Sequence, residues 1–197
     1  MLQHAGVPSS TLYGTDIFAG FEHVGHSFFR DRDSFADRFF VADVFDDSDA
    51  SPLNLTAGMW DVVSATMFLH QFDLVAQKRI AARLLRLLRP CKGSMLIGNN
   101  TGELVASSIP LRAPFCKEGE KKELFRQSRE SMREMWEETV REYNTAASQD
   151  VKAEFNIWCE YDRKEAEKRE QEMKKEGQVR FFRGDGQRRI LWCVERL

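Results

Sequence analysis

The sequence predicts an α/β fold in which a mostly parallel sheet carries helices on both faces. Short runs of apolar and β-branched residues alternate with segments of helical periodicity, and two of these runs stop at an aspartate. The length of 197 residues fits one domain. We therefore expect a single domain over residues 1–197, with ligands near the carboxyl ends of the strands.

Two strands and one helix are expected in the first fifty residues. The apolar run Leu12–Ile17 predicts the first strand, and Arg38–Val44 predicts the second. The polar residues 46–52 then interrupt the pattern. Between the two strands apolar residues recur on helical faces, which indicates a helix that carries Phe18, Phe21, Val24, Phe28 and Phe29.

A strand–helix–strand unit follows. Trp60–Thr66 predicts a third strand and Ser94–Gly98 a fourth, preceded by a turn at Lys92-Gly93. Pro90 ends the intervening helix, because proline cannot continue a helix and disfavours it in the residue before. That helix spans residues 73–88 and carries an apolar stripe of Val75, Ile80, Leu84, Leu85 and Leu88.

The second half of the chain is less regular. Residues 99–120 contain glycines and prolines and are expected to be irregular, whereas residues 121–143 predict a helix. Two more strands are predicted at Val151–Trp158 and Arg189–Glu195. The charge-dense run Glu160–Glu176 has almost no apolar face, so we expect a solvated helical insertion.

Composition and charge argue against several classes of protein. A net charge of −2 provides no basic field for nucleic acid or for an anionic membrane. The sequence shows neither a secretory signal nor a membrane span. The four cysteines are scattered without a C-x-x-C pair, which favours reduced thiols in a cytoplasmic protein.

Acidic residues at strand ends are the most informative local feature. Asp16 and Asp43 end the first two predicted strands, so both carboxylates are expected at one crevice, where they suit a ribose diol and an adenine amino group. Asp61 opens the next strand at the opposite end, and we assign it a structural role. The alternative for Asp16 and Asp43 is a turn or a helix cap.

A wider set of motifs occurs in a specific order along the chain. They are Leu12-Tyr13-Gly14 with Asp16; Phe29–Arg32; Phe40–Asp43; Asp61–Val63; Phe68–Phe72; Leu87–Pro90 with Gly93-Ser94; and Phe125-Arg126 followed by Met135–Glu138. In this order and spacing the sequence resembles the class I S-adenosylmethionine-dependent methyltransferases, in particular the small-molecule methyltransferases of fungal natural-product pathways. The resemblance is good over residues 5–140 and loose thereafter.

The resemblance implies a Rossmann-like fold, S-adenosyl-L-methionine as cofactor, and O-methylation of a polyketide- or terpenoid-like small molecule. It implies that Asp16 holds the ribose and that Asp43, flanked by Ala42 and Val44, holds the adenine. Ser64 and Ala65 stand where small residues would let the methionine part approach, or they are simply small residues at a crowded strand end. His70 would accept a proton from the acceptor; the alternative is a histidine that packs and bonds a loop carbonyl.

One part of the family pattern is missing. In this family a first strand and a glycine-rich turn precede the ribose-binding acid, but the fifteen residues before Asp16 contain no such turn. The resemblance therefore implies an N-terminally truncated domain, with Gly6 as the stop of a preceding helix. The missing strand would lie between Leu12–Ile17 and Trp60–Thr66, which would otherwise pair directly or splay apart. The alternative function is consequently a non-catalytic, methyltransferase-like pseudoenzyme or partner subunit.

Three further expectations concern individual residues. His23 and His26 share a helix face, but no third ligand with suitable spacing follows, so we predict no metal site. Gly98 and Gly102 are interpreted as a turn that leads into a segment covering the substrate. That segment offers either a pocket lining or plain core residues at helical spacing, namely Phe115, Phe125, Met132, Met135 and Trp136.

Overall fold

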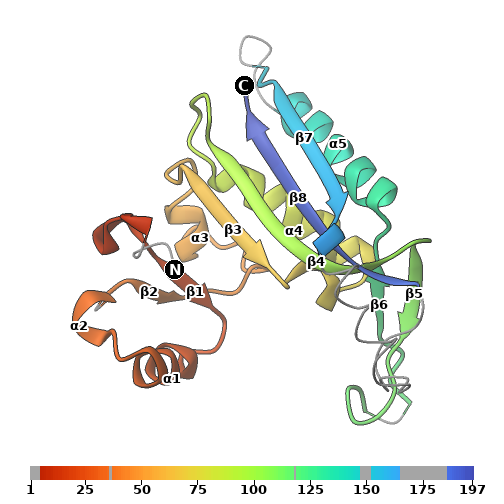
Figure 1. Cartoon of the computed structure of the whole chain (residues 1–197), viewed down its shortest axis with the longest axis horizontal. Coiled ribbons are helices and arrows are strands. Elements are labelled where there is room, and N and C mark those ends of the chain that lie inside the picture. Colours follow the sequence, from red (N-terminus) through yellow and green to blue (C-terminus); the bar gives the residue numbers. More distant parts are fainter. Residues whose placement is uncertain (1–4, 36, 118, 147–151, 165–185) are drawn as a thin grey trace. The chain divides into compact units, whose positions relative to one another are not determined.

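The computed structural model describes residues 5–35, 37–117, 119–146, 152–164 and 186–197. The chain divides into two compact units, Met1–Ala57 and Gly58–Leu197 (Figure 1). Each unit has its own strands and helices. The expectation of one domain over the whole chain stays a prediction.

The first unit contains the predicted strand–helix–strand order. Its two strands pair in parallel, with Gly14 opposite Phe39 and Asp16 opposite Val41. Gly6 has φ +89°, and residues 1–4, where the preceding helix is predicted, lie outside the described part of the chain. The elements are η2 (Ser9–Thr11), β1 (Gly14–Asp16), α1 (Gly20–Phe29), α2 (Arg32–Phe35), β2 (Phe39–Val41) and α3 (Pro52–Leu55).

The described part of the first unit buries few side chains. Among residues 5–35 and 37–57, only Ala42, Ser51 and Leu53 are buried. The helix α1 has no buried residue, although its apolar periodicity is as the sequence predicts. Its large apolar side chains are instead exposed: Phe21, Val24, Phe28 and Phe29.

The second unit is built on a four-stranded sheet of order β3-β4-β8-β7, whose strands lie side by side in Figure 1. The pair β3–β4 is parallel, but β4–β8 and β8–β7 are antiparallel. The expectation of a mostly parallel sheet is therefore wrong for this unit. The helix between β3 and β4 gives that pair the crossover that parallel strands require, whereas β8 runs antiparallel to both of its neighbours. The strands are β3 (Val62–Thr66), β4 (Met95–Glu103), β7 (Phe155–Tyr161) and β8 (Gln187–Arg196).

Two long helices, α4 (Leu74–Leu87) and α5 (Arg129–Ala146), pack against each other behind this sheet (Figure 1). They cover one face of the sheet. The opposite face carries Val62, Ile97 and Trp158, which lie on three different strands and are exposed. The described helices of this unit therefore do not cover both faces as predicted. The stripe on α4 is confirmed except at Val75, which is 79% exposed.

The core between sheet and helices is aromatic and aliphatic. The rings of Trp136 on α5 and Trp192 on β8 lie 4.8 Å apart, and both side chains are fully buried. Asp73 caps α4, because its carboxylate accepts a hydrogen bond from the Ala76 amide at 2.8 Å. Leu85, Leu96 and Ile190 are also completely buried.

The segment after Gly98 differs from the prediction. β4 continues to Glu103, so Gly98 and Gly102 lie inside a strand and not in a turn. A side chain at Gly98 would collide with the Trp192 ring and approach the Ala65 carbonyl oxygen to 2.5 Å, and one at Gly102 would collide with Ile190 and Gln127. Glycine is therefore required by close approach of neighbouring chains, not by a bend.

Residues 104–128 also differ from the expected irregular segment and helix start. β5 (Ser107–Pro110) and β6 (Glu123–Arg126) form an antiparallel pair, and α5 begins only at Arg129. β6 is held by a further hydrogen bond from the Phe125 amide to the Phe72 carbonyl at 2.9 Å. Tertiary pairing thus overrides the helical periodicity at the front of the predicted helix.

The charged run was predicted to be a helical insertion at Glu160–Glu176. Glu160 and Tyr161 instead belong to β7, where Glu160 lies opposite Leu191. Residues 165–176 lie outside the described part of the chain.

Among the described residues, β1 has a ladder only with β2, and β3 has a ladder only with β4. The direct pairing or splaying of the two predicted neighbours of the missing strand stays a prediction. Each of these strands keeps one edge without a ladder partner in the described residues.

We expect Gly98→Ala to destabilise the second unit by about 1–3 kcal/mol, because the new methyl group has no room beside Trp192. Denaturant unfolding followed by tryptophan fluorescence measures this unit selectively, since all four tryptophans lie in it. Gly186→Ala is the control, because a Cβ there meets nothing within 4 Å. Equal unfolding midpoints for the two variants would contradict the packing argument.

Candidate functional site

The two strand-end carboxylates lie together in the first unit. Asp16 ends β1 and Asp43 follows β2 by two residues, so both stand at the carboxyl edge of one parallel pair. One oxygen of each carboxylate bonds its own turn: Asp16 accepts from the Phe18 amide at 2.9 Å, and Asp43 from the Phe45 amide at 2.8 Å. The alternative turn role is therefore present, but it uses one of the two carboxylate oxygens and leaves the other as a potential acceptor.

The residues next to Asp43 differ in accessibility. Ala42 is buried and its amide bonds the Asp16 carbonyl at 3.1 Å, which links the two strand ends. Val44 is half-buried beside it. The ends of β1 and β2 therefore form a fixed frame for the two carboxylates, as a nucleoside site requires.

Ser64 and Ala65 belong to the second unit, on β3. Successive strand residues point to opposite faces, and accordingly Ala65 is buried against the helical side while Ser64 is exposed and lies 3.3 Å from the Thr66 hydroxyl. The two side chains cannot both face one ligand. Ala65 fits the alternative of a small residue at a crowded strand end, because its carbonyl oxygen lies against Gly98.

His70 lies in the short helix η3 (Leu69–Gln71), just beyond the carboxyl end of β3. The chain reaches it through Met67, which has φ +54° and whose amide bonds the Asn99 carbonyl at 2.7 Å. Arg126 of β6 fixes the helix from the other side, since its guanidinium donates to the His70 carbonyl at 2.9 Å. Backbone contacts from β4 and β6 thus fix the segment that carries His70, whose Nδ1 atom is buried without a hydrogen-bond partner.

Burial lowers the pKa of His70 below its usual value, and the positive charge of Arg126 lowers it further. Interaction with the neighbouring Asn100 side chain works in the opposite direction. Burial also lowers the pKa of Arg126, against the effect of the Glu103 carboxylate. His70 is consequently a neutral imidazole at neutral pH, the protonation state that can accept a proton.

A cavity of about 720 Å³ lies beside η3, between the start of α4 and the β5–β6 pair. Its wall mixes apolar residues with charged ones, and Glu120 and Lys122 form an ion pair of 2.9 Å in it. His70 does not line this cavity, but Gln71, the next residue, does. The lining includes Gln71, Phe72, Asp73, Ala76, Pro110, Leu111 and Leu124.

The residues proposed as a pocket lining behave mostly as core. Met132, Met135 and Trp136 are buried in the helix–sheet interface, which is the plain-core alternative, and Phe115 is 71% exposed. Phe125 takes part in β6. None of these five side chains lines the cavity beside η3.

The metal and membrane expectations can be compared with the described residues. In that part of the chain no group of three or more His, Cys, Asp or Glu side chains could hold a metal ion, and His26 instead bonds Asp31. None of the helices described is long and apolar enough to cross a membrane. All four cysteines are free, and burial raises the pKa of Cys159 to about 12, which keeps its thiol protonated.

Comparison with known proteins gives clear sequence relatives. No protein-family model matches the chain. It is 36% identical to the O-methyltransferase phiE of a fungal species over 73% of this chain and 46% of phiE. The O-methyltransferase atr3 of Stereocaulon alpinum is 34% identical over 68% of this chain and 37% of atr3, and the methyltransferase adrK of Penicillium rubens is 41% identical over 49% and 34%. The chain thus spans less than half the length of these relatives.

Solved structures share the fold at low identity. A protein of Pyrococcus horikoshii covers 100% of this chain and 74% of its own length with a TM-score of 0.55 and 12% identity. The phosphoethanolamine N-methyltransferase 2 of Haemonchus contortus was solved with S-adenosylhomocysteine. Its match spans 94% of this chain and 43% of that protein, with a TM-score of 0.53 and 12% identity. The chain belongs to the class I S-adenosylmethionine-dependent methyltransferase family. Within that family it is related to the fungal natural-product O-methyltransferases, as the sequence motifs predicted.

Sequence reasoning missed the surroundings of His70. Asn100 is buried in the middle of β4, and neither of its side-chain atoms has a hydrogen-bond partner of ordinary geometry. The signal available in the sequence was the position of Asn100, two residues from both Gly98 and Gly102. Glycines inside a strand indicate the close approach of a neighbouring chain. Arg126 was included in a motif without a role.

We predict that His70 makes the second unit less stable in acid. The folded-state pKa is lowered, so stability is complete above the unfolded pKa of about 6.5 and decreases as the pH falls through that value. His70→Gln should reduce the loss of stability between about pH 7.5 and 5.5. Tryptophan fluorescence isolates the effect, because His70 is the one histidine in this unit. An unchanged loss in the variant would show that another group is responsible.

Proposed function

We propose that this chain is part of an S-adenosyl-L-methionine-dependent enzyme that methylates an oxygen of a small natural-product acceptor. The observation that carries the proposal is the pair of half-buried carboxylates, Asp16 and Asp43, at the carboxyl ends of two paired parallel strands in a relative of phiE. Carboxylate oxygens suit the donors of a ribose diol and of an adenine amino group.

The cofactor would supply an electrophilic methyl group, and the chain supplies binding and orientation. Asp16 would accept hydrogen bonds from the ribose hydroxyls with the carboxylate oxygen that its turn does not use. The corresponding oxygen of Asp43 would accept one from the adenine amino group. Backbone at Ala42 and Val44 would provide further cofactor contacts. The residues present fit the nucleoside half of the cofactor, since carboxylate oxygens accept hydrogen bonds from a ribose diol and an adenine amino group.

His70 is proposed as the base that takes the acceptor proton. Its lowered pKa keeps the imidazole neutral, and the bond from Arg126 to its carbonyl fixes its position. The cavity beside η3 is proposed as the acceptor site, because it has the volume of a small-molecule pocket and is lined by Gln71, the residue next to His70. A polyketide- or terpenoid-like acceptor fits its mixed polar and apolar wall.

The second candidate is a non-catalytic, methyltransferase-like protein or a partner subunit. The bonds of Asp16 and Asp43 to the amides of their own turns favour it, because that role needs no cofactor. Both candidates share the fold. They differ in whether the chain binds the cofactor.

Binding of S-adenosylhomocysteine separates the two candidates. For the enzyme we expect saturable binding that Asp16→Ala weakens by about ten- to a hundredfold, the effect of losing hydrogen bonds to a charged group. Titration calorimetry on the folded proteins measures this change. Asp61→Ala is the control, because Asp61 lies at the other end of its strand and pairs with Arg89 at 2.8 Å.

Equal losses from both substitutions would show that Asp16 is not a ribose ligand. Absence of binding up to about 1 mM in the unsubstituted chain would favour the non-catalytic candidate. Methyl transfer by the chain would exclude that candidate.

A further inference from the structure

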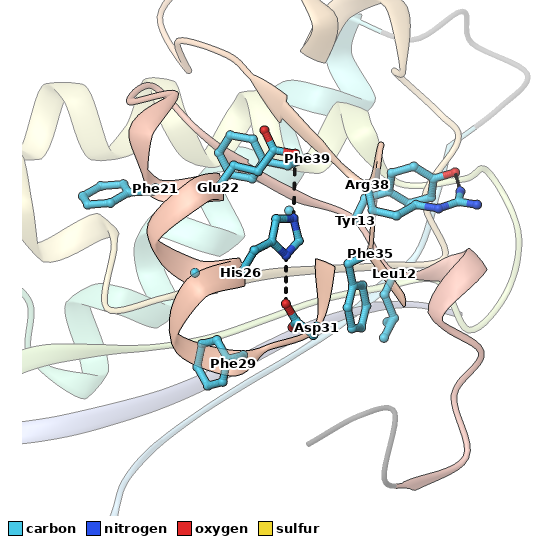
Figure 2. Close-up of a pocket in the computed structure, with 12 residues that line it drawn as sticks. Leu12, Tyr13, Phe21, Glu22, His26, Phe29, Asp31, Phe35, Arg38 and Phe39 are labelled. Carbon is cyan, nitrogen blue, oxygen red and sulfur yellow. Dashed lines mark hydrogen bonds and ion pairs between the residues drawn. The ribbon is translucent and has the colours of Figure 1, made fainter. Parts of the chain in front are cut away.

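The first unit contains a cavity that is separate from the two strand-end carboxylates. Its volume is about 360 Å³, and it lies between α1, α2 and the β1–β2 pair (Figure 2). Neither Asp16 nor Asp43 lines it. Its wall carries five aromatic rings, those of Tyr13, Phe21, Phe29, Phe35 and Phe39.

A histidine with two acidic neighbours lies at the centre of this wall. Figure 2 shows the His26 imidazole between Asp31 and Glu22. Its Nδ1 atom lies 2.8 Å from the Asp31 carboxylate, and its Nε2 atom lies 3.9 Å from the Glu22 carboxylate. The fold builds this arrangement: residues 22 and 26 are one helical turn apart, and Arg30, with φ +55°, ends α1 and turns the chain back toward His26.

The hydrogen-bond roles follow from the geometry. A carboxylate only accepts, so the Nδ1 atom of a neutral His26 carries the proton and donates to Asp31. The Nε2 atom is then an acceptor, and it is buried without a hydrogen-bond partner. Glu22 opposite it is also an acceptor and 3.9 Å is too long for a hydrogen bond, so neither satisfies the other.

Two acceptors at this separation match one group that carries several protons. A primary ammonium group between them donates to both, whereas a hydroxyl group has a single proton and donates to one. The charge agrees: the lining carries Glu22, Asp31 and Arg38, a net negative charge when His26 is neutral. Arg38 is occupied at the far end, where it bonds the Tyr13 hydroxyl and lies 5.0 Å from the centre of that ring.

We propose that this cavity binds a small aromatic molecule with a primary ammonium group on a short chain. The ammonium bonds Nε2 of His26 and the carboxylate of Glu22, and the surrounding rings bind the aromatic part and attract the cation. Glu22 is 40% exposed, so its side chain rotates to admit the ligand without repacking of the core. The site does not depend on the methyltransferase function.

The test compares two probes of equal shape on the unsubstituted chain. We expect 2-phenylethylamine to bind saturably and 2-phenylethanol to bind at least about tenfold more weakly, because the alcohol lacks the charge and the additional protons. Backbone amide NMR measures both affinities and shows whether the shifts map to α1, α2 and β1. Equal affinities, or shifts elsewhere, would overturn the proposal.

Two variants test the named groups. Glu22→Gln, which keeps the shape and removes the charge, should weaken the amine about tenfold or more but not the alcohol. Asp33→Asn is the matched control, since Asp33 is an acid of α2 that does not line the cavity. Nitrogen NMR of the His26 ring gives an independent readout: a doubly protonated ring at pH 7.5 would remove the acceptor and contradict the proposal.

Discussion

The close approach of β4 to its neighbours is the constraint on which the second unit depends. Gly98 has the Trp192 ring on one side and the Ala65 carbonyl on the other, so the parallel and the antiparallel ladder meet at a position without a side chain. Trp192 in turn packs against Trp136 of α5, with the two ring planes tilted by 41°. The carbonyl of Asn99, one residue on, bonds the amide of Met67 and so fixes the loop before His70.

The same strand connects packing with electrostatics. Asn100 lies on the same face of β4 as Gly98 and Gly102, and it is buried beside the half-buried imidazole of His70. Partial burial disfavours an added charge on the histidine, and the positive charge of Arg126 adds to this effect, so the imidazole stays neutral. The protonation state of His70 thus depends on a strand that also holds the sheet together.

The elements with strong periodicity could be predicted from the sequence, and those that depend on partners could not. α4 and α1 were predicted within a few residues, because their apolar spacing is local. The antiparallel strands β5 and β6 were missed, since what stabilises them is a ladder with each other and a bond to Phe72. For the site, the acids at strand ends could be recognised as a pattern in the sequence. The neighbours of His70 could not, because Asn100 and Arg126 lie far from it along the chain.

The unpaired edges of β1 and β3 have a practical consequence for anyone who expresses this chain. An open edge is a template on which another strand can add, and proteins normally protect such edges with charge, proline or a covering segment. Val62 and Val41 on these strands are instead exposed and apolar, as are the phenylalanines of α1. Oligomers and inclusion bodies that form with rising concentration are the failure expected of such a surface, and a solubilising fusion partner is the natural remedy.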